Sequence, residues 1–129
     1  MIYTVEGGTK AQRKVVDSAM SYVVHILKIP NKVNVEIVLG KFISHGVRED
    51  SKNSFEIEIC KAVNDAEIAY TVFHEMKHVE QLASGRLRHQ GFITFWEGKD
   101  MPLIEYHQRP WEIEAFKFEK NADSILTFV

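Results

Sequence analysis

TVFHEMKHVEQ, residues 71–81, places His74 and His78 four positions apart, with Glu75 directly after the first. Apolar residues around this stretch recur at helical spacing, which predicts a helix over residues 64–84. Side chains at positions i and i+4 of a helix stand over one another, so both imidazoles can reach one ion. The pattern HExxH is typical of a zinc site with a glutamate base. The alternative is a solvated helix that carries two imidazoles by chance.

A helical wheel separates the two histidines from the apolar stripe. With Val72 at zero, the apolar residues fall within an arc of roughly 120°. His74 and His78 fall at about 200° and about 240°, so we expect them to face away from the core. Glu75 falls at about 300°, where it can reach a water without being a ligand itself.

A third ligand decides between the two interpretations, because a catalytic zinc uses three protein groups and an open fourth position. Residues 108–116, QRPWEIEAF, place Glu112 and Glu114 in the first turns of a helix that Pro110 opens. Glu112 falls among apolar residues, where a carboxylate needs a cation, whereas Glu114 groups with Lys117 on an expected wet surface. The pattern therefore favours Glu112 over the other downstream candidates, which are His89, Glu97, Asp100, Glu105, His107 and Glu114.

The remaining patterns predict one α+β domain with a short, mostly antiparallel sheet. The 129 residues suffice for one core. The expected elements are a helix over 9–28 capped by Thr9, strands over 33–39, 54–60 and 91–96, a loop over 40–53, and a last helix over 111–126. Either the 54–60 or the 91–96 strand could offer an edge to an extended substrate.

Composition narrows the classes of partner. The net charge of −2 gives no reason to expect binding to nucleic acid or to an anionic membrane. Cys60 is the only cysteine, so no intrachain disulfide forms. No apolar run approaches the ~20 residues that cross a bilayer, and the N-terminus does not resemble a secretory signal. We therefore expect a cytoplasmic protein.

HEMKH followed by WEIEA resembles the gluzincin metallopeptidases, in which a glutamate on a later helix completes the zinc site. The longer pattern is HExxHxxQ, then Trp96-x-Gly98, then RPWEIEA, and it is similar to small metallopeptidases encoded by phages and bacteria. This resemblance covers residues 66–120. It implies a single zincin-like domain over residues 1–129, with a metal-bearing helix between an N-terminal helix and a C-terminal one.

The same resemblance implies that His74, His78 and Glu112 bind Zn²⁺. Many gluzincins carry an aspartate four residues after the ligand glutamate, where it supports the site. Phe116 occupies that position here, so either another acid orients the histidines or the site is tuned differently.

The leading functional hypothesis is zinc-dependent hydrolysis of a protein or peptide substrate. Glu75 would take the proton of a zinc-activated water. Tyr106 and His107 directly precede the ligand helix, and either could hydrogen-bond a developing oxyanion, with Tyr106 preferred. The rival hypotheses are a zinc-binding regulatory or partner-binding domain with little or no turnover, and a structural zinc, which would leave Glu75 without a use. The other histidines are expected to lie outside the site: His25, His45 and His89.

Overall fold

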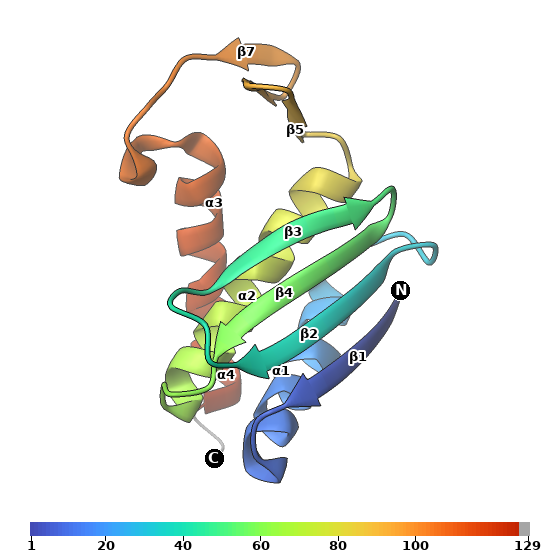
Figure 1. Cartoon of the computed structure of the whole chain (residues 1–129), viewed down its shortest axis with the longest axis vertical. Coiled ribbons are helices and arrows are strands. Elements are labelled where there is room, and N and C mark those ends of the chain that lie inside the picture. Colours follow the sequence, from blue (N-terminus) through green and yellow to red (C-terminus); the bar gives the residue numbers. More distant parts are fainter. Residues whose placement is uncertain (127–129) are drawn as a thin grey trace.

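Seven strands and three long helices make up residues 1–126, the part of the chain that the computed structural model describes (Figure 1). Within this range no helix is both long and apolar enough to cross a membrane. In chain order the elements are β1 (Ile2–Gly7), α1 (Lys10–Ile26), β2 (Asn34–Gly40), β3 (Gly46–Ser51), β4 (Ser54–Cys60), α2 (Asp65–Ala83), β5 (Leu87–Gln90), β6 (Ile93–Trp96), β7 (Lys99–Met101), η1 (Tyr106–Gln108), α3 (Pro110–Glu119), η2 (Lys120–Ala122) and α4 (Asp123–Leu126).

The larger sheet has the strand order β1-β2-β4-β3 and is mixed. Strand β1 pairs with β2 in parallel, β2 pairs with β4 in parallel, and only β3 and β4 are antiparallel. The expectation of a mostly antiparallel sheet is therefore wrong for this sheet. The reason is two unrecognised strands. The helical crossover through α1 returns the chain in the direction of β1, and the intervening strand β3, which pairs on the outer side of β4, makes β4 parallel to β2.

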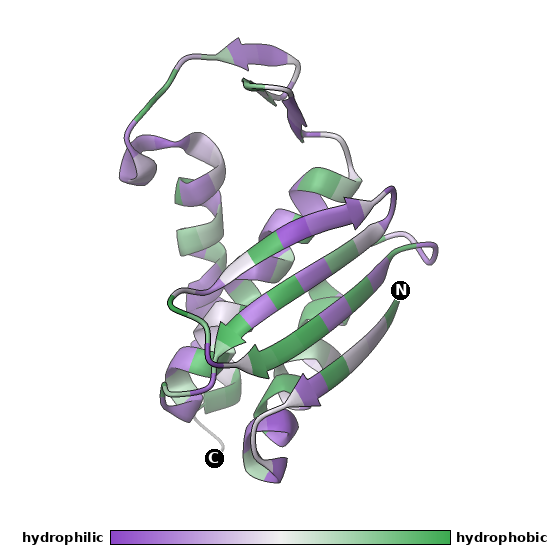
Figure 2. Ribbon diagram, in the orientation of Figure 1, coloured by the Kyte–Doolittle hydropathy of each residue, from purple (hydrophilic) through white to green (hydrophobic). Residues whose placement is uncertain are grey.

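Helices α1 and α2 lie against one face of this sheet, and the core forms between them (Figure 1). Strands β2 and β4 bury every second residue. Apolar and polar residues alternate along β4, whereas residues 37–39 of β2 are all apolar (Figure 2). The predicted N-cap Thr9 is confirmed, because its side chain accepts from the Gln12 backbone in a reciprocal capping box. Asn64 caps α2, and its side chain accepts from the Glu67 backbone.

Four edge strands were not predicted: β1 and β3 of the larger sheet, and β5 and β7 of the smaller sheet. The segment 40–53, expected to be a loop, contains β3, in which only Gly46 and Val47 are partly covered and the other four residues are exposed. Strand β1 likewise has no fully buried residue. An edge strand that packs so little against the core shows no strict apolar period, so pattern alone does not find it.

The smaller sheet, with the order β5-β6-β7, connects the end of α2 to the turn before α3 (Figure 1). Strand β6 corresponds to the expected 91–96 strand and lies between two partners, and β4 also has a partner on each side. Neither the 54–60 nor the 91–96 strand therefore offers an edge to a substrate. Strand β3 lies at an edge of the larger sheet instead. The expected last helix also divides after Glu119, where the Asn121 side chain donates to the Phe118 carbonyl.

Candidate metal centre

Helix α2 holds the two histidines on the side that α3 covers. His74 and His78 are only 7% and 6% exposed, and their ring centroids lie 4.9 Å apart. The helical wheel correctly separates the two histidines from the apolar stripe of α2. They are nevertheless buried rather than exposed to solvent. The stripe packs on α1 and the sheet, and the opposite side packs on α3, so α2 is buried on two sides.

Glu112, in the first turn of α3, completes a three-residue cluster. The Nε2 atom of His74 lies 3.0 Å from its Oε1 atom, and the Nε2 atom of His78 lies 3.1 Å from the same oxygen. One potential ligand atom from each residue lies within 4.8 Å of the others, and all three side chains are buried. This buried His-His-Glu group could hold a metal ion.

The hydrogen bonds at the far side of each imidazole fix its tautomer. The Nδ1 atom of His74 donates to the Glu119 carboxylate at 2.8 Å, and Nδ1 of His78 donates to the Gln81 amide oxygen at 2.8 Å. Gln81 must present its oxygen to His78, because its nitrogen donates to the Trp111 carbonyl at 3.1 Å. In the neutral imidazoles the Nε2 lone pairs then both face Glu112. The two Nε2 lone pairs and a lone pair of the Glu112 carboxylate converge on one point, and such an arrangement suits a cation.

Glu119 supplies the acid that Phe116 does not. It lies seven residues after Glu112, two helical turns further on, and so returns to the same face of α3. Phe116 packs edge-on against His74 with ring centroids 4.7 Å apart. The i,i+7 spacing of Glu112 and Glu119 is the feature of the sequence that could have indicated this acid.

The electrostatics of the cluster favour a positive charge between its members. Burial by itself would lower the pKa of His74 and His78, but hydrogen bonds to Glu112 and the nearby carboxylates raise both above the ordinary value. Burial would raise the pKa of Glu112, but hydrogen bonds from the two histidines, which carry Nε2–H when charged, outweigh it and lower that pKa to about 2. A cation bound between the three side chains would interact favourably with the Glu112 carboxylate, as the charged histidines do.

Glu75 is buried beside the cluster but does not belong to it. Its side chain is 7% exposed and lines two adjoining cavities, of about 450 and 620 Å³. His74 lines the first cavity and His78 the second. Burial raises the pKa of Glu75 above its ordinary value, although the two histidines partly oppose this. The carboxylate is therefore a stronger base than an exposed glutamate.

Tyr106, in the turn η1, lines both cavities beside Glu75. Burial and the nearby negative charge of Glu112 raise the pKa of its phenol. The hydroxyl thus keeps its proton at neutral pH and can donate it in a hydrogen bond. His107 packs its ring on Tyr106 and Phe116, with centroids 5.3 and 6.0 Å away.

His45 is a residue of these cavities that the sequence did not indicate. It lines both of them together with Glu75 and Tyr106. Its Nδ1 atom accepts a hydrogen bond from the Cys60 backbone at 3.1 Å, so in the neutral ring the proton lies on Nε2. The segment before β3 was expected to be a polar loop, and no local pattern reports that it returns to α2.

The other candidate ligands point elsewhere. Glu114 was expected on a wet surface beside Lys117, but it is half-buried and paired with Arg86 and, at 3.7 Å, with Lys77. Glu97 also pairs with Arg86, and His89 contacts Thr94 on the neighbouring strand. The exposed side chains of the smaller sheet and of the turn after it include Asp100 and Glu105.

No protein-family profile, curated protein or solved structure matches the chain. The functional assignment therefore rests on the donor set and the geometry of this centre.

Proposed function

We propose that this protein is a zinc-dependent peptidase whose ion is held by His74, His78 and Glu112. The observation that carries the proposal is the pairing of a three-ligand cluster with a buried fourth group, Glu75, that is not a ligand and faces the cavities. A structural zinc site closes with four protein ligands, whereas a catalytic site keeps a position open for water. Two imidazoles and one carboxylate are a donor set that suits zinc.

Each residue of the centre has one role in this proposal. A bound zinc ion supplies Lewis acidity and lowers the pKa of a water from about 15.7 to near 7. Glu75 takes the proton of the attacking water and later gives one to the leaving amine. Tyr106 and His45 both line the cavities, and the phenol O–H and the imidazole Nε2–H can donate to the oxyanion that develops on the scissile carbonyl. Glu119 and Gln81 hold the imidazoles in register.

Strand β3 supports the choice of an extended peptide as substrate. It pairs with β4 along one side only, so its other edge carries backbone groups able to accept a further strand. Residues 46–49 of β3 line the 620 Å³ cavity together with Glu75 and His78. A peptide added to β3 would bring a backbone carbonyl past these residues.

The replacement Glu75→Gln tests the proposal. The amide has nearly the shape of the carboxylate but no basic oxygen, so we expect full zinc content and a loss of hydrolysis by a factor of about 10² to 10⁴. The assay uses unstructured proteins as substrates, with a chelator-treated sample as the negative control. The matched variant is Glu80→Gln, on the same helix but outside the cavity lining, which should cleave like the wild type.

Equal cleavage by Glu75→Gln and the wild type would overturn the mechanism. If both bind zinc and neither cleaves any substrate, the result favours a zinc-binding regulatory or partner-binding domain, which needs the same three ligands but no base.

A further inference from the structure

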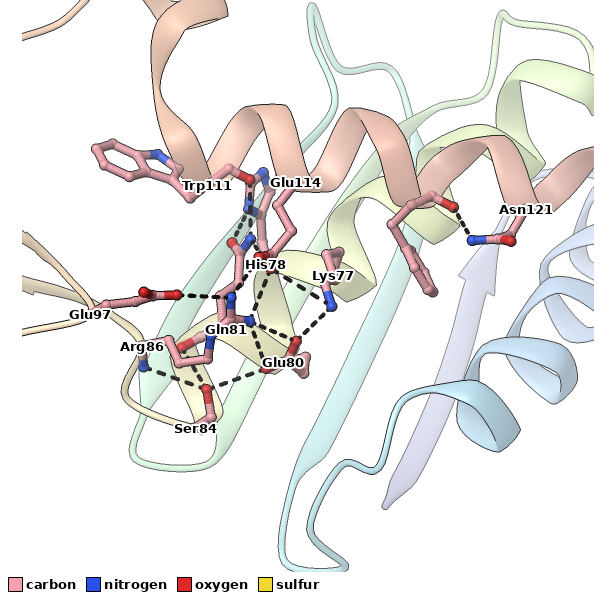
Figure 3. Close-up of polar contacts among 11 residues, drawn as sticks. Lys77, His78, Glu80, Gln81, Ser84, Arg86, Glu97, Trp111, Glu114 and Asn121 are labelled. Carbon is pink, nitrogen blue, oxygen red and sulfur yellow. Dashed lines mark hydrogen bonds and ion pairs between the residues drawn. The ribbon is translucent and has the colours of Figure 1, made fainter.

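Behind His78 a chain of polar contacts runs out to the smaller sheet (Figure 3). Nδ1 of His78 donates to Oε1 of Gln81 at 2.8 Å, and Nε2 of Gln81 donates to Oε1 of Glu114 at 3.0 Å. Glu114 in turn accepts two bonds from the Arg86 guanidinium, at 2.9 and 2.5 Å. These residues come from α2, from α3 and from the segment between α2 and β5.

Gln81 is the part of this chain that cannot adjust. Its side chain is fully buried, so no water can replace a lost partner. If the amide turned over, its oxygen would face both the Trp111 carbonyl and the Glu114 carboxylate, and its NH₂ group would face Nδ1 of His78. Glu114 and the Trp111 carbonyl therefore together fix the orientation of Gln81, and Gln81 fixes which nitrogen of the neutral His78 carries the proton.

Arg86 ties the same chain to the smaller sheet. Its guanidinium carbon lies 4.9 Å from the centroid of the Trp96 ring, and its Nη2 atom lies 3.4 Å from Glu97. Its carbonyl oxygen also accepts from the Glu97 backbone at 2.7 Å. A two-bond arginine–carboxylate contact transmits geometry as well as charge, since the two planar groups must align. The position of β6 and the orientation of Glu114 are thus linked through the Arg86 side chain.

We propose that Gln81, Glu114 and Arg86 form a positioning relay, which keeps the His78 imidazole in the orientation that a metal ligand needs. The relay also couples metal affinity to the position of the smaller sheet. The proposal rests on the metal centre of the proposed function but not on hydrolysis. None of the three residues contacts the ion. They act by holding the lone pair of His78 Nε2 toward Glu112.

The test is the zinc dissociation constant of Glu114→Ala, measured by competition with a chromophoric chelator. Loss of a residue that supports a ligand from outside typically weakens metal binding by a factor of about 10 to 100, and we expect a change in this range. Glu114→Gln should fall between Glu114→Ala and the wild type, because its amide oxygen can still accept from Gln81. The matched control is Glu80→Ala, which also removes a partner of Arg86, at 3.1 Å, but none of Gln81. It should bind zinc within about twofold of the wild type, the scatter expected for a group outside the relay.

Two further readouts separate positioning from general destabilisation. The visible absorption bands of the Co²⁺-substituted protein report ligand geometry, and they should shift in Glu114→Ala and stay unchanged in Glu80→Ala. In a double-mutant cycle, Gln81→Leu and Glu114→Ala together should weaken zinc binding hardly more than Gln81→Leu alone, because residues of one relay are not additive. If Gln81→Leu does not fold, Arg86→Ala takes its place in the cycle.

Equal zinc affinity and equal Co²⁺ spectra in Glu114→Ala and Glu80→Ala would overturn the relay, as would full additivity in the cycle. A wild-type protein that binds no stoichiometric zinc would instead overturn the metal centre itself. The two failures are therefore distinguishable.

Discussion

Glu112 faces His74 and His78 from the first turn of α3, which begins two residues earlier at Pro110. Residues two apart on a helix point about 200° apart, so Glu112 can face the histidines only if Glu114 faces away. That choice could be made from sequence, because apolar neighbours surround one glutamate and not the other. The contribution of His45 could not be predicted from sequence, because it depends on tertiary packing that brings the segment before β3 to α2.

At the residue scale we expect Glu112→Ala to abolish stoichiometric zinc binding. The change removes a ligand itself, so its effect should exceed the factor of about 100 seen when outer supporting residues are lost. Elemental analysis after gel filtration measures the zinc content. Glu105→Ala, in the exposed turn before α3, is the control and should keep the wild-type content. One zinc per chain in Glu112→Ala would contradict the ligand assignment.

Elements with strong periodicity were predictable, and those at the margins of the fold were not. Helices α1 and α2 each bury a stripe and begin at a side-chain cap, so composition and spacing agree along their whole length. Strands β2 and β4 bury alternate residues and are central. The edge strands β1 and β3 bury almost nothing and carry no such period. The topology of the larger sheet was therefore not predicted correctly at its two edge strands, and the smaller sheet's edge strands β5 and β7 were missed as well.

At the element scale the junction between β1 and α1 depends on Gly7. Its φ is +79°, and a Cβ there would lie 2.1 Å from the Leu39 carbonyl oxygen of the paired strand. Gly91 also has a positive φ, of +61°, but nothing lies within 4 Å of its Cβ position. We expect Gly91→Ala to cost about 1 to 2 kcal/mol, the backbone penalty alone. Gly7→Ala should cost at least about 3 kcal/mol, because the strands must also separate.

Urea unfolding of both variants measures these free energies. Equal losses in the two variants would mean that β1 shifts without cost and that its pairing with β2 contributes little.

On the scale of the whole molecule, metal and fold are linked by mass action. The ligands come from α2 and α3, so only the folded chain brings them together. At a free zinc concentration of 100 times the dissociation constant, such a ligand adds about 2.7 kcal/mol to the free energy of unfolding. For a chain of this length, that corresponds to a rise in melting temperature on the order of 10 °C.

Thermal unfolding of the chelator-treated protein, with and without added zinc, checks this expectation. His78→Ala should show no rise, since it lacks a ligand. A rise of the same size in His78→Ala would mean that zinc stabilises the protein from another site.

His78 and Glu112 are 34 positions apart in the chain, and all of β5, β6 and β7 lies between them. An ion held by both side chains would close this segment into a ring. Unlike a disulfide, this closure exists only while the ligands are held together in the folded chain, so it restricts local opening of the segment rather than the unfolded chain. The small sheet contributes no residue to the main apolar core and would be anchored chiefly at the two ends of that ring. The segment most exposed to proteases after chelation would then be the insertion between α2 and α3, while α1 and the larger sheet keep their protection.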